Sequence, residues 1–159
     1  MKEKLSIKNF GPIKNVDLEL KRVNILIGEQ GTGKSSIGKI LAIFNDDWFL
    51  QEPNFLQSLQ FYNIDSYLKP NSEIQYENEF IKVTCKGNTN NEVVIEFLNI
   101  ELKSWVENIR LVRQKWRATK DATKEAILDE LLKIRVEFEK KYYVSKYIPS
   151  ERTIIGSND

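Results

Sequence analysis

The sequence of 159 residues contains no histidine and one cysteine. Without histidine there is no imidazole to act as a general base, to bind a metal ion or to titrate near neutral pH. Cys85 cannot form a disulfide within the chain, and it lies in the strand-like run from Phe80 to Cys85. We therefore expect a buried, unreactive thiol and a protein of the reducing cytoplasm.

Long hydrophobic runs are also absent, and the net charge is small. No apolar stretch approaches the roughly 18 residues of a membrane span. Met1 to Lys4 lead into alternating positions rather than the apolar core of a signal peptide, so no membrane association is expected. A net charge of +1 argues against a whole surface dedicated to polyanions. The basic excess is local, with 12 lysines and arginines against 7 acids from Lys103 to Lys146.

The most informative feature is a glycine-rich stretch, residues 28–35, which fits the phosphate-binding P-loop (Walker A) pattern G-x-x-x-x-G-K-[ST]. The apolar run from Val23 to Ile27 precedes it and predicts a buried strand. Ser36 to Phe44 follows it with the apolar spacing of an amphipathic helix. This order of strand, loop and helix is the context that the motif requires, so the sequence predicts a nucleotide-binding loop.

Each residue type in this loop has a physical reason. Glycines let the chain curl so that successive N–H groups converge on one phosphate. A helix beginning near Gly33 adds unpaired N–H groups and the positive end of its dipole. We expect Lys34 to reach the β- and γ-phosphates of ATP, Ser35 to ligate Mg²⁺, and Ser36 to be placed for the α-phosphate. The predicted nucleotide-binding residues are Gly28, Glu29, Gln30, Gly31, Thr32, Gly33, Lys34, Ser35 and Ser36.

The rest of the first hundred residues predicts a β-rich core. Alternating apolar residues and turn-forming residues indicate short strands and one short helix. The expected elements are strands at 5–9 and 16–20 around the Gly11-Pro12 turn, a helix within 53–68, and a β-hairpin or meander made by 73–86 and 93–97 around a turn at 87–91.

A helical segment is expected over residues 104–147. Ser104 and Glu107 have the spacing of a capping box, which predicts a helix start near Ser104. Two apolar stripes follow: Trp105, Ile109, Val112 and Trp116, then Ile127, Leu131, Ile134 and Phe138. One long helix and a helical hairpin bending near residues 118–123 both fit. Pro149 ends the helical pattern, and 148–159 is expected to be extended. We treat 1–159 as a single, incomplete domain.

The order of Leu5-Ser6-Ile7-Lys8-Asn9-Phe10-Gly11-Pro12-Ile13, a second strand and the glycine-rich loop resembles the N-terminus of ABC-type ATPases of the RecF, SMC and OLD kind. The resemblance covers residues 3–44. Tyr147 to Arg152 is similar to AAA-family proteins of bacterial defence systems. By resemblance the fold is mixed α/β. It is the first lobe of an ATPase head, with an antiparallel sheet, a P-loop strand and helix, and a long helical C-terminal segment.

Several parts of that family are missing from the sequence. There is no serine-glycine-glycine signature, no switch histidine and no apolar strand ending in Asp-Glu. Asp129-Glu130 lies inside a helical repeat, where the pattern predicts a solvated face. Gly11 departs from relatives that often carry a basic residue there. The resemblance therefore implies no catalytic residue in this chain, and hydrolysis would need motifs beyond Asp159 on a C-terminal ATPase lobe.

Two classes of function remain open. The first is an ATP-binding lobe of a motor or switch ATPase, in which two heads close around nucleotide and drive a DNA-related or defence effector. Apolar faces left bare without the second lobe would favour a homodimer. The second is a non-catalytic interaction or nucleic-acid-binding module in which the loop is a structural turn. A basic helical face could serve the second class, or be a solvated surface paired with Asp121, Glu125 and Asp129. Its members are Arg110, Arg113, Arg117, Lys120 and Lys124. Phe10 could stack on adenine or pack beside Pro12.

Overall fold

Alternating apolar and polar residues build one antiparallel sheet. Its strands are β1 (Glu3–Phe10), β2 (Ile13–Leu20), β3 (Glu73–Glu77), β4 (Ile81–Lys86) and β5 (Val93–Phe97). The order across the sheet is β2-β1-β3-β4-β5, and every neighbouring pair is antiparallel. The two N-terminal strands and the later meander are therefore confirmed, as is the mixed α/β fold with an antiparallel sheet.

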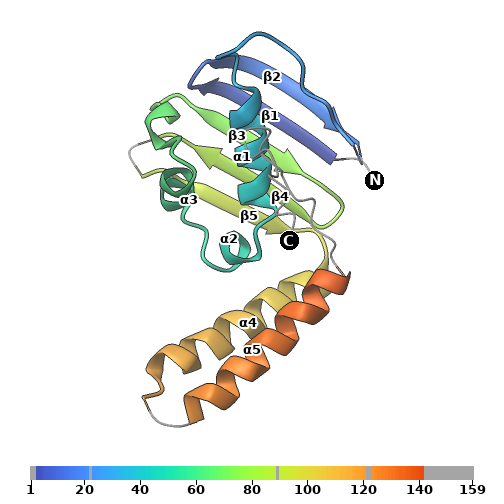
Figure 1. Ribbon diagram of the computed structural model, residues 1–159, viewed down its shortest axis with the longest axis vertical. Helices are drawn as coiled ribbons and strands as arrows, with labels where there is room; N and C mark the ends of the chain where they lie inside the picture. Colours follow the sequence, from blue (N-terminus) through green and yellow to red (C-terminus); the bar gives the residue numbers. More distant parts are fainter. Residues whose placement is uncertain (1–2, 22, 89, 121–122, 142–159) are drawn as a thin grey trace, which may run out of the picture.

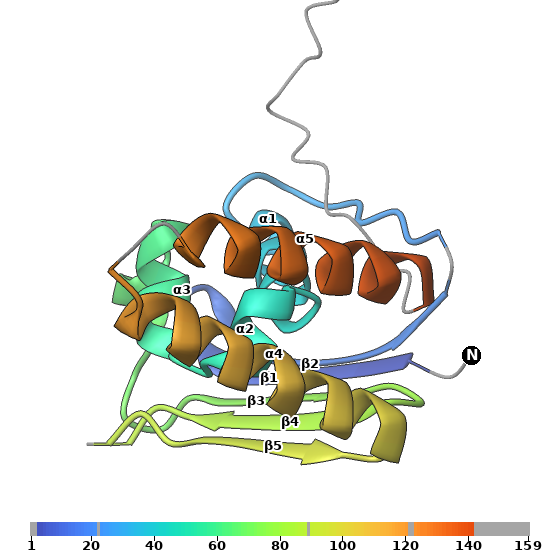
Figure 2. The ribbon, with the colours of Figure 1, turned by 90° about the horizontal axis from the view of Figure 1, so that it is seen from below.

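The structure is a computed structural model that describes residues 3–21, 23–88, 90–120 and 123–141. Its helices are α1 (Lys34–Phe44), α2 (Asp47–Gln51), α3 (Phe55–Phe61), the 3-10 turn η1 (Asp65–Tyr67), α4 (Ile100–Ala118) and α5 (Thr123–Lys141). The first three helices lie on one face of the sheet, and α4 and α5 form a hairpin that extends beyond its β5 edge (Figures 1 and 2). The helical hairpin is thus the correct choice between the two open alternatives.

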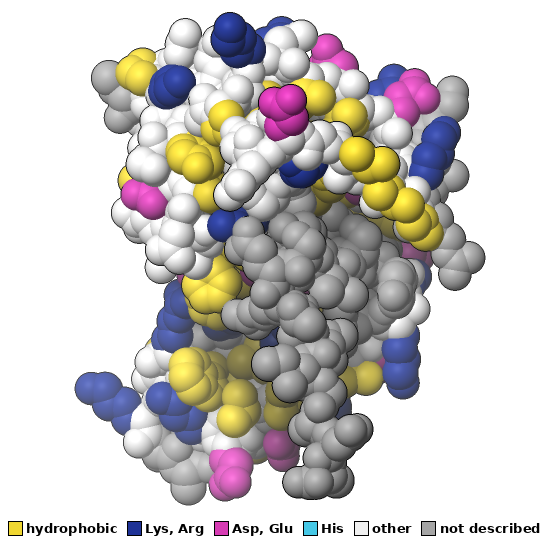
Figure 3. Space-filling view, turned by 45° about the horizontal axis from the view of Figure 1, so that its top comes forward, with side chains coloured by type: hydrophobic (Ala, Val, Ile, Leu, Met, Phe, Trp, Pro, Cys, Tyr) yellow, Lys and Arg dark blue, Asp and Glu magenta, His cyan; other side chains and the backbone are white. Residues whose placement is uncertain are grey.

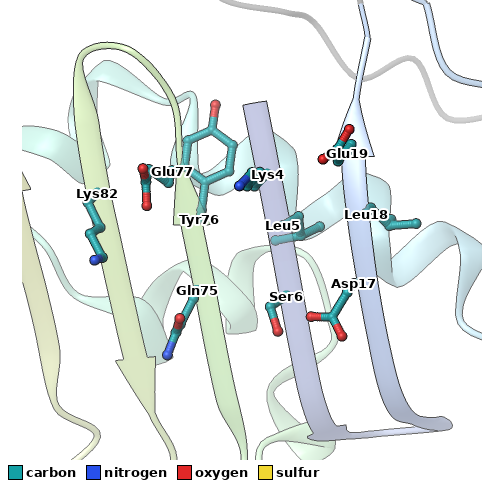
Figure 4. Close-up of a pocket in the computed structure, with 10 residues that line it drawn as sticks. All are labelled: Lys4, Leu5, Ser6, Asp17, Leu18, Glu19, Gln75, Tyr76, Glu77 and Lys82. Atoms are coloured by element: carbon teal, nitrogen blue, oxygen red, sulfur yellow. The ribbon is translucent and has the colours of Figure 1, made fainter. Parts of the chain in front are cut away.

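The opposite face of the sheet, which the described helices leave bare, carries charges of alternating sign. One row crosses all five strands in register: Glu19, Lys4, Glu77, Lys82 and Glu96. In a second row Lys8 lies 3.9 Å from Glu73. Figure 4 shows a hollow on this face lined by side chains of both charges. Because opposite charges directly across strands attract, the face neutralises itself and has no excess charge for a phosphate.

The core lies between the sheet and the helices, and an aromatic cluster is its centre. The ring of Phe44, at the end of α1, lies 5.7 Å from Phe49 of α2, 5.9 Å from Phe55 of α3 and 5.5 Å from Tyr76 of β3. All four side chains are at most 2% exposed. The Tyr76 hydroxyl lies 2.7 Å from a carboxylate oxygen of Glu3. This cluster fixes one end of α1 on the sheet.

The predicted buried strand at residues 23–27 is wrong. The segment has no regular structure, and Val23, Ile25 and Ile27 are 77%, 80% and 89% exposed. No backbone–backbone hydrogen bond joins it to another described residue, and the Asn24 side chain bonds to the backbone of Lys21. A strand needs a neighbour to satisfy its backbone groups, and the five described strands pair only with one another. The segment passes instead from the end of β2 over the top of the sheet to α1 (Figure 1).

The start of the helical segment also differs from the prediction. Asn99 is the N-cap of α4, and its Oδ1 accepts a hydrogen bond of 2.9 Å from the backbone N–H of Leu102. Ser104 lies inside the helix, so its apparent capping box is not used. Asparagine is among the best N-cap residues, and starting at Asn99 also buries Leu102 in the core. The predictions for 142–147 and 148–159 lie outside the described residues.

Two predictions, one from the single cysteine and one from the lack of long apolar runs, can be compared with the structure. Cys85 is 1% exposed, and burial raises the pKa of its thiol far above the ordinary value. The predicted buried, unreactive cysteine is confirmed, because the thiolate is the reactive form. Among the described helices, none combines the length and the apolar composition that crossing a bilayer requires.

The aromatic cluster gives a stability prediction. Replacing Phe44 with Ala should lower the free energy of unfolding by about 3–5 kcal/mol, because it removes a fully buried ring and leaves a cavity. Phe61→Ala is the matched control, since that ring is 79% exposed. Urea unfolding followed by circular dichroism measures both changes. Equal losses for the two variants would contradict the assigned core.

Candidate nucleotide-binding site

The glycine-rich loop connects the exposed segment 23–27 to the N-terminus of α1. Gly31 and Gly33 have φ angles of +81° and +93°, in the left-handed region that favours glycine. A Cβ placed on Gly33 would lie 2.6 Å from Ile13 and 3.3 Å from Pro12. The turn between β1 and β2 therefore packs directly against the start of α1, and it fixes the loop at the end of the sheet.

The loop folds around the ammonium group of Lys34. The Nζ atom donates to the backbone oxygens of Gly28, at 2.8 Å, and Glu29, at 2.5 Å, and lies 3.3 Å from the hydroxyl of Thr32. That hydroxyl also donates to the Glu29 oxygen at 3.0 Å. A cation thus occupies the inside of the curl, held by groups of the loop itself. The chain places this positive charge beside the free end of a helix.

The N-terminus of α1 presents donors with no side-chain acceptor. Its N-cap is Gly33, which makes no capping hydrogen bond, and no acidic residue lies in the first turn. The first intrahelical bond runs from the N–H of Ile37 to the oxygen of Gly33 at 3.0 Å. The N–H groups before it and the helix dipole favour an anion at this point. Together with Lys34 they form a concentrated positive site.

The structure brings the nine predicted residues into one contiguous loop and first helical turn. Glu29, Gln30 and Thr32 are exposed. Ser35 is exposed as well, so its side chain is available as a ligand for a metal ion. Ser36 is 3% exposed, so contact between its hydroxyl and a nucleotide requires a local rearrangement.

The Asp129-Glu130 pair of the helical segment lies away from the loop, in which the one carboxylate is that of Glu29. Asp129 and Glu130 are exposed on α5, as the helical pattern predicts. In Figure 1 that helix lies below the sheet, whereas the loop lies at the top. No cluster of three metal-binding side chains occurs among the described residues. The described loop therefore combines a cation with free helix N–H groups and has no cluster of acidic side chains beside it.

The structure decides the role of Phe10. Its ring is 0% exposed and makes an edge-to-face contact with Tyr67 at 5.9 Å. A ring enclosed in this way cannot stack on adenine, so the packing interpretation is correct.

The basic face of the helical segment is largely occupied by protein contacts. The guanidinium groups of Arg110, Arg113 and Arg117 all contact α2 or the residue after it. The Lys124 ammonium lies 4.2 Å from the Trp116 ring centre. The predicted pairing of this face with acids on its own helices is not what holds these arginines. No local pattern indicated this arrangement, because the short helix α2 was not predicted and it lies about 60 residues from these arginines along the chain.

Comparison with known proteins gives one match. A family model described as an AAA ATPase domain matches residues 1–158, nearly the whole chain. Neither the comparison with curated proteins nor that with solved structures found a match. The loop of residues 28–35 lies within the matched region.

Substitutions at Gly31 and Gly33 can distinguish the cost of backbone strain from the cost of a packing clash. Gly33→Ala and Gly31→Ala should each cost roughly 1–2 kcal/mol for placing a Cβ in the left-handed region. Gly33→Ala should cost more, because its Cβ meets Ile13, whereas the Cβ of Gly31 meets open space. Urea unfolding of the two variants measures the difference. A larger loss for Gly31→Ala would show that the β1–β2 turn does not support the loop.

Proposed function

Because the chain belongs to the AAA ATPase domain family, we propose that it binds ATP with Mg²⁺ through residues 28–36. The observation that carries the proposal is the ring of loop oxygens around the Lys34 ammonium at an uncapped helix N-terminus. Polyphosphate is the ligand that this arrangement suits, because one cation and several N–H donors converge on a small volume. The charge-balanced face of the sheet offers no comparable site.

Each part of the loop has a defined role in this proposal. Lys34 exchanges its contacts with Glu29 and Thr32 for phosphate oxygens and retains a bond to the loop. The N–H groups of the first turn of α1 donate to the same phosphate. Ser35 supplies a hydroxyl oxygen to Mg²⁺, a ligand type that this cation prefers. When bound, Mg²⁺ neutralises charge on the phosphates, and the loop holds them in place.

We further propose that hydrolysis depends on a second ATPase lobe, as in the RecF, SMC and OLD proteins that the sequence resembles. Phosphoryl transfer needs a positioned water and a metal-binding carboxylate as well as a cradle. The exposed segment 23–27 supports this proposal. Figure 3 shows hydrophobic side chains exposed on the sheet-bearing part of the molecule. An apolar run of this kind is typical of a strand buried between two neighbours, and strands of the second lobe would supply them.

The central prediction concerns Lys34. Mg-ATP should bind the wild-type chain with measurable heat in isothermal titration calorimetry. Lys34→Ala should weaken binding by roughly 10–100-fold, the loss of a charged hydrogen bond worth about 1.5–3 kcal/mol. Lys39→Ala is the matched control, because Lys39 lies on the same helix but donates to the backbone oxygen of Tyr62. Equal binding by all three proteins would overturn the proposed site.

The exposed segment gives a separate prediction. Replacing Ile25 and Ile27 together with Asp should reduce binding of a hydrophobic dye and any self-association, because both side chains are at least 80% exposed. The melting temperature should remain within a few degrees of wild type. Dye fluorescence, sedimentation and calorimetry measure these quantities. Unfolding of the double variant would show that the two side chains are part of the core.

A further inference from the structure

The hairpin of α4 and α5 is attached to the body of the molecule in two ways: Leu102 and Val106 of α4 lie in the apolar core, and four arginines contact α2 and the residue after it. Each of four arginines on the hairpin contacts a different residue in the short stretch Asp47–Glu52. The contacts are Arg110 Nε to the Gln51 oxygen at 2.9 Å, Arg113 over the Trp48 ring at 3.9 Å, Arg117 to Glu52 at 2.8 Å and Arg135 to Asp47 at 3.7 Å. We call this set of contacts the arginine latch.

The arginine latch is polar, unlike the aromatic core beside it. It joins two carboxylates, a carbonyl oxygen and an indole to four cations. Ion pairs of this kind, with Arg117 and Arg135 about half exposed, depend on ionic strength and give little net stability. The contact therefore differs from the apolar packing of Phe49 and Leu50, which holds α2 itself in the core. Since Leu102 and Val106 anchor the start of α4 in the core, the hairpin can swing away from α2 about that anchor without unfolding α2.

Two buried polar atoms in the latch have no partner among the described residues. They are Nη1 of Arg113 and Oε1 of Gln51, a donor and an acceptor. Burial also lowers the pKa of Arg113, although Asp47 and Glu52 oppose this shift. Leaving buried polar atoms unpaired costs free energy, and release of the hairpin would return both to water. The closed latch thus leaves one donor and one acceptor unsatisfied, a cost that opening would remove.

The latch is joined to the glycine-rich loop by one rigid element. The N-terminus of α1 closes the loop at Lys34, and its C-terminus ends at Phe44. Only Asn45 and Asp46 separate that end from α2. The ring of Phe44 contacts that of Phe49 in α2 at 5.7 Å, so the two helices pack together. A small rotation of α1 at its N-terminus would therefore displace α2 beneath the four arginines.

From these contacts we propose that the arginine latch is a release device, which opens when nucleotide binds the loop and frees the α4–α5 hairpin and its arginines. The inference rests on the proposed function for its trigger. The latch contacts themselves do not depend on that function. Release would increase the exposure of Trp48, which is 45% exposed in the closed form, and would free four cations from their present partners.

The test measures the distance between the hairpin and the sheet. Spin labels are attached to cysteines introduced at Ala118, at the end of α4, and Glu19, on the bare face of β2. The buried Cys85 should not react. Pulsed electron paramagnetic resonance should give one narrow distribution of label-to-label distances without nucleotide. With Mg-ATP it should give a second population at a different distance, which we call the displaced population. The displaced population should be absent in Lys34→Ala.

Charge exchange provides the matched control for the latch. Arg117→Glu should show the displaced population without nucleotide, because it places a carboxylate against Glu52. The double variant Glu52→Arg with Arg117→Glu should restore the narrow distribution, because the pair is rebuilt with reversed charges. Circular dichroism should show the same helix content in all variants. Raising the salt concentration should increase the displaced population in wild type.

The outcomes distinguish the latch from the proposed function. Binding heat with an unchanged distance distribution would overturn the latch and leave ATP binding intact. A distribution unaffected by Arg117→Glu would overturn the latch as well. Absence of binding heat would overturn the proposed function, and nucleotide control of the hairpin with it.

Discussion

The position of α1 on the sheet is the constraint on which the rest of the molecule depends. At one end Phe44 is enclosed by rings from α2, α3 and β3. At the other end Gly33 lies against the β1–β2 turn, too close for a Cβ. With both ends fixed, the loop before Lys34 must curl within a short span, and its oxygens converge on the ammonium group. The curl of the loop around Lys34, which we propose as the phosphate site, is thus a consequence of how one helix is packed.

Those parts of the fold with strong local patterns could be predicted from the sequence. β1 to β5 alternate clearly, and the glycine spacing before Lys34 indicates a loop and helix start. The prediction of a strand at 23–27 was wrong because the composition is that of a strand with neighbours on both sides. No described strand lies beside this segment. The predicted helix start at Ser104 was wrong because Asn99 is an equally good N-cap, and a start at Asn99 buries Leu102. In both places the local pattern was real, but tertiary contacts decided the structure.

The basic residues of the hairpin are a second case in which tertiary contacts could not be predicted from the local pattern. Their helical spacing suggested a surface for nucleic acid or for pairs within the helices. In the fold, Arg110, Arg113 and Arg117 contact the region of α2, which is about 60 residues earlier in the chain. A five-residue helix has too short a pattern to be recognised in a sequence, so its partners could not be inferred either. Most of the positive charge on this face is therefore engaged by α2 and the residue after it.

The central claim, that nucleotide phosphates are held by the loop and the first turn of α1, is tested most directly by amide hydrogen exchange with and without Mg-ATP. The account predicts slower exchange at residues 28–36, where N–H groups would donate to phosphate, and little change across β4 and β5. Unchanged exchange at 28–36 under saturating Mg-ATP would contradict it.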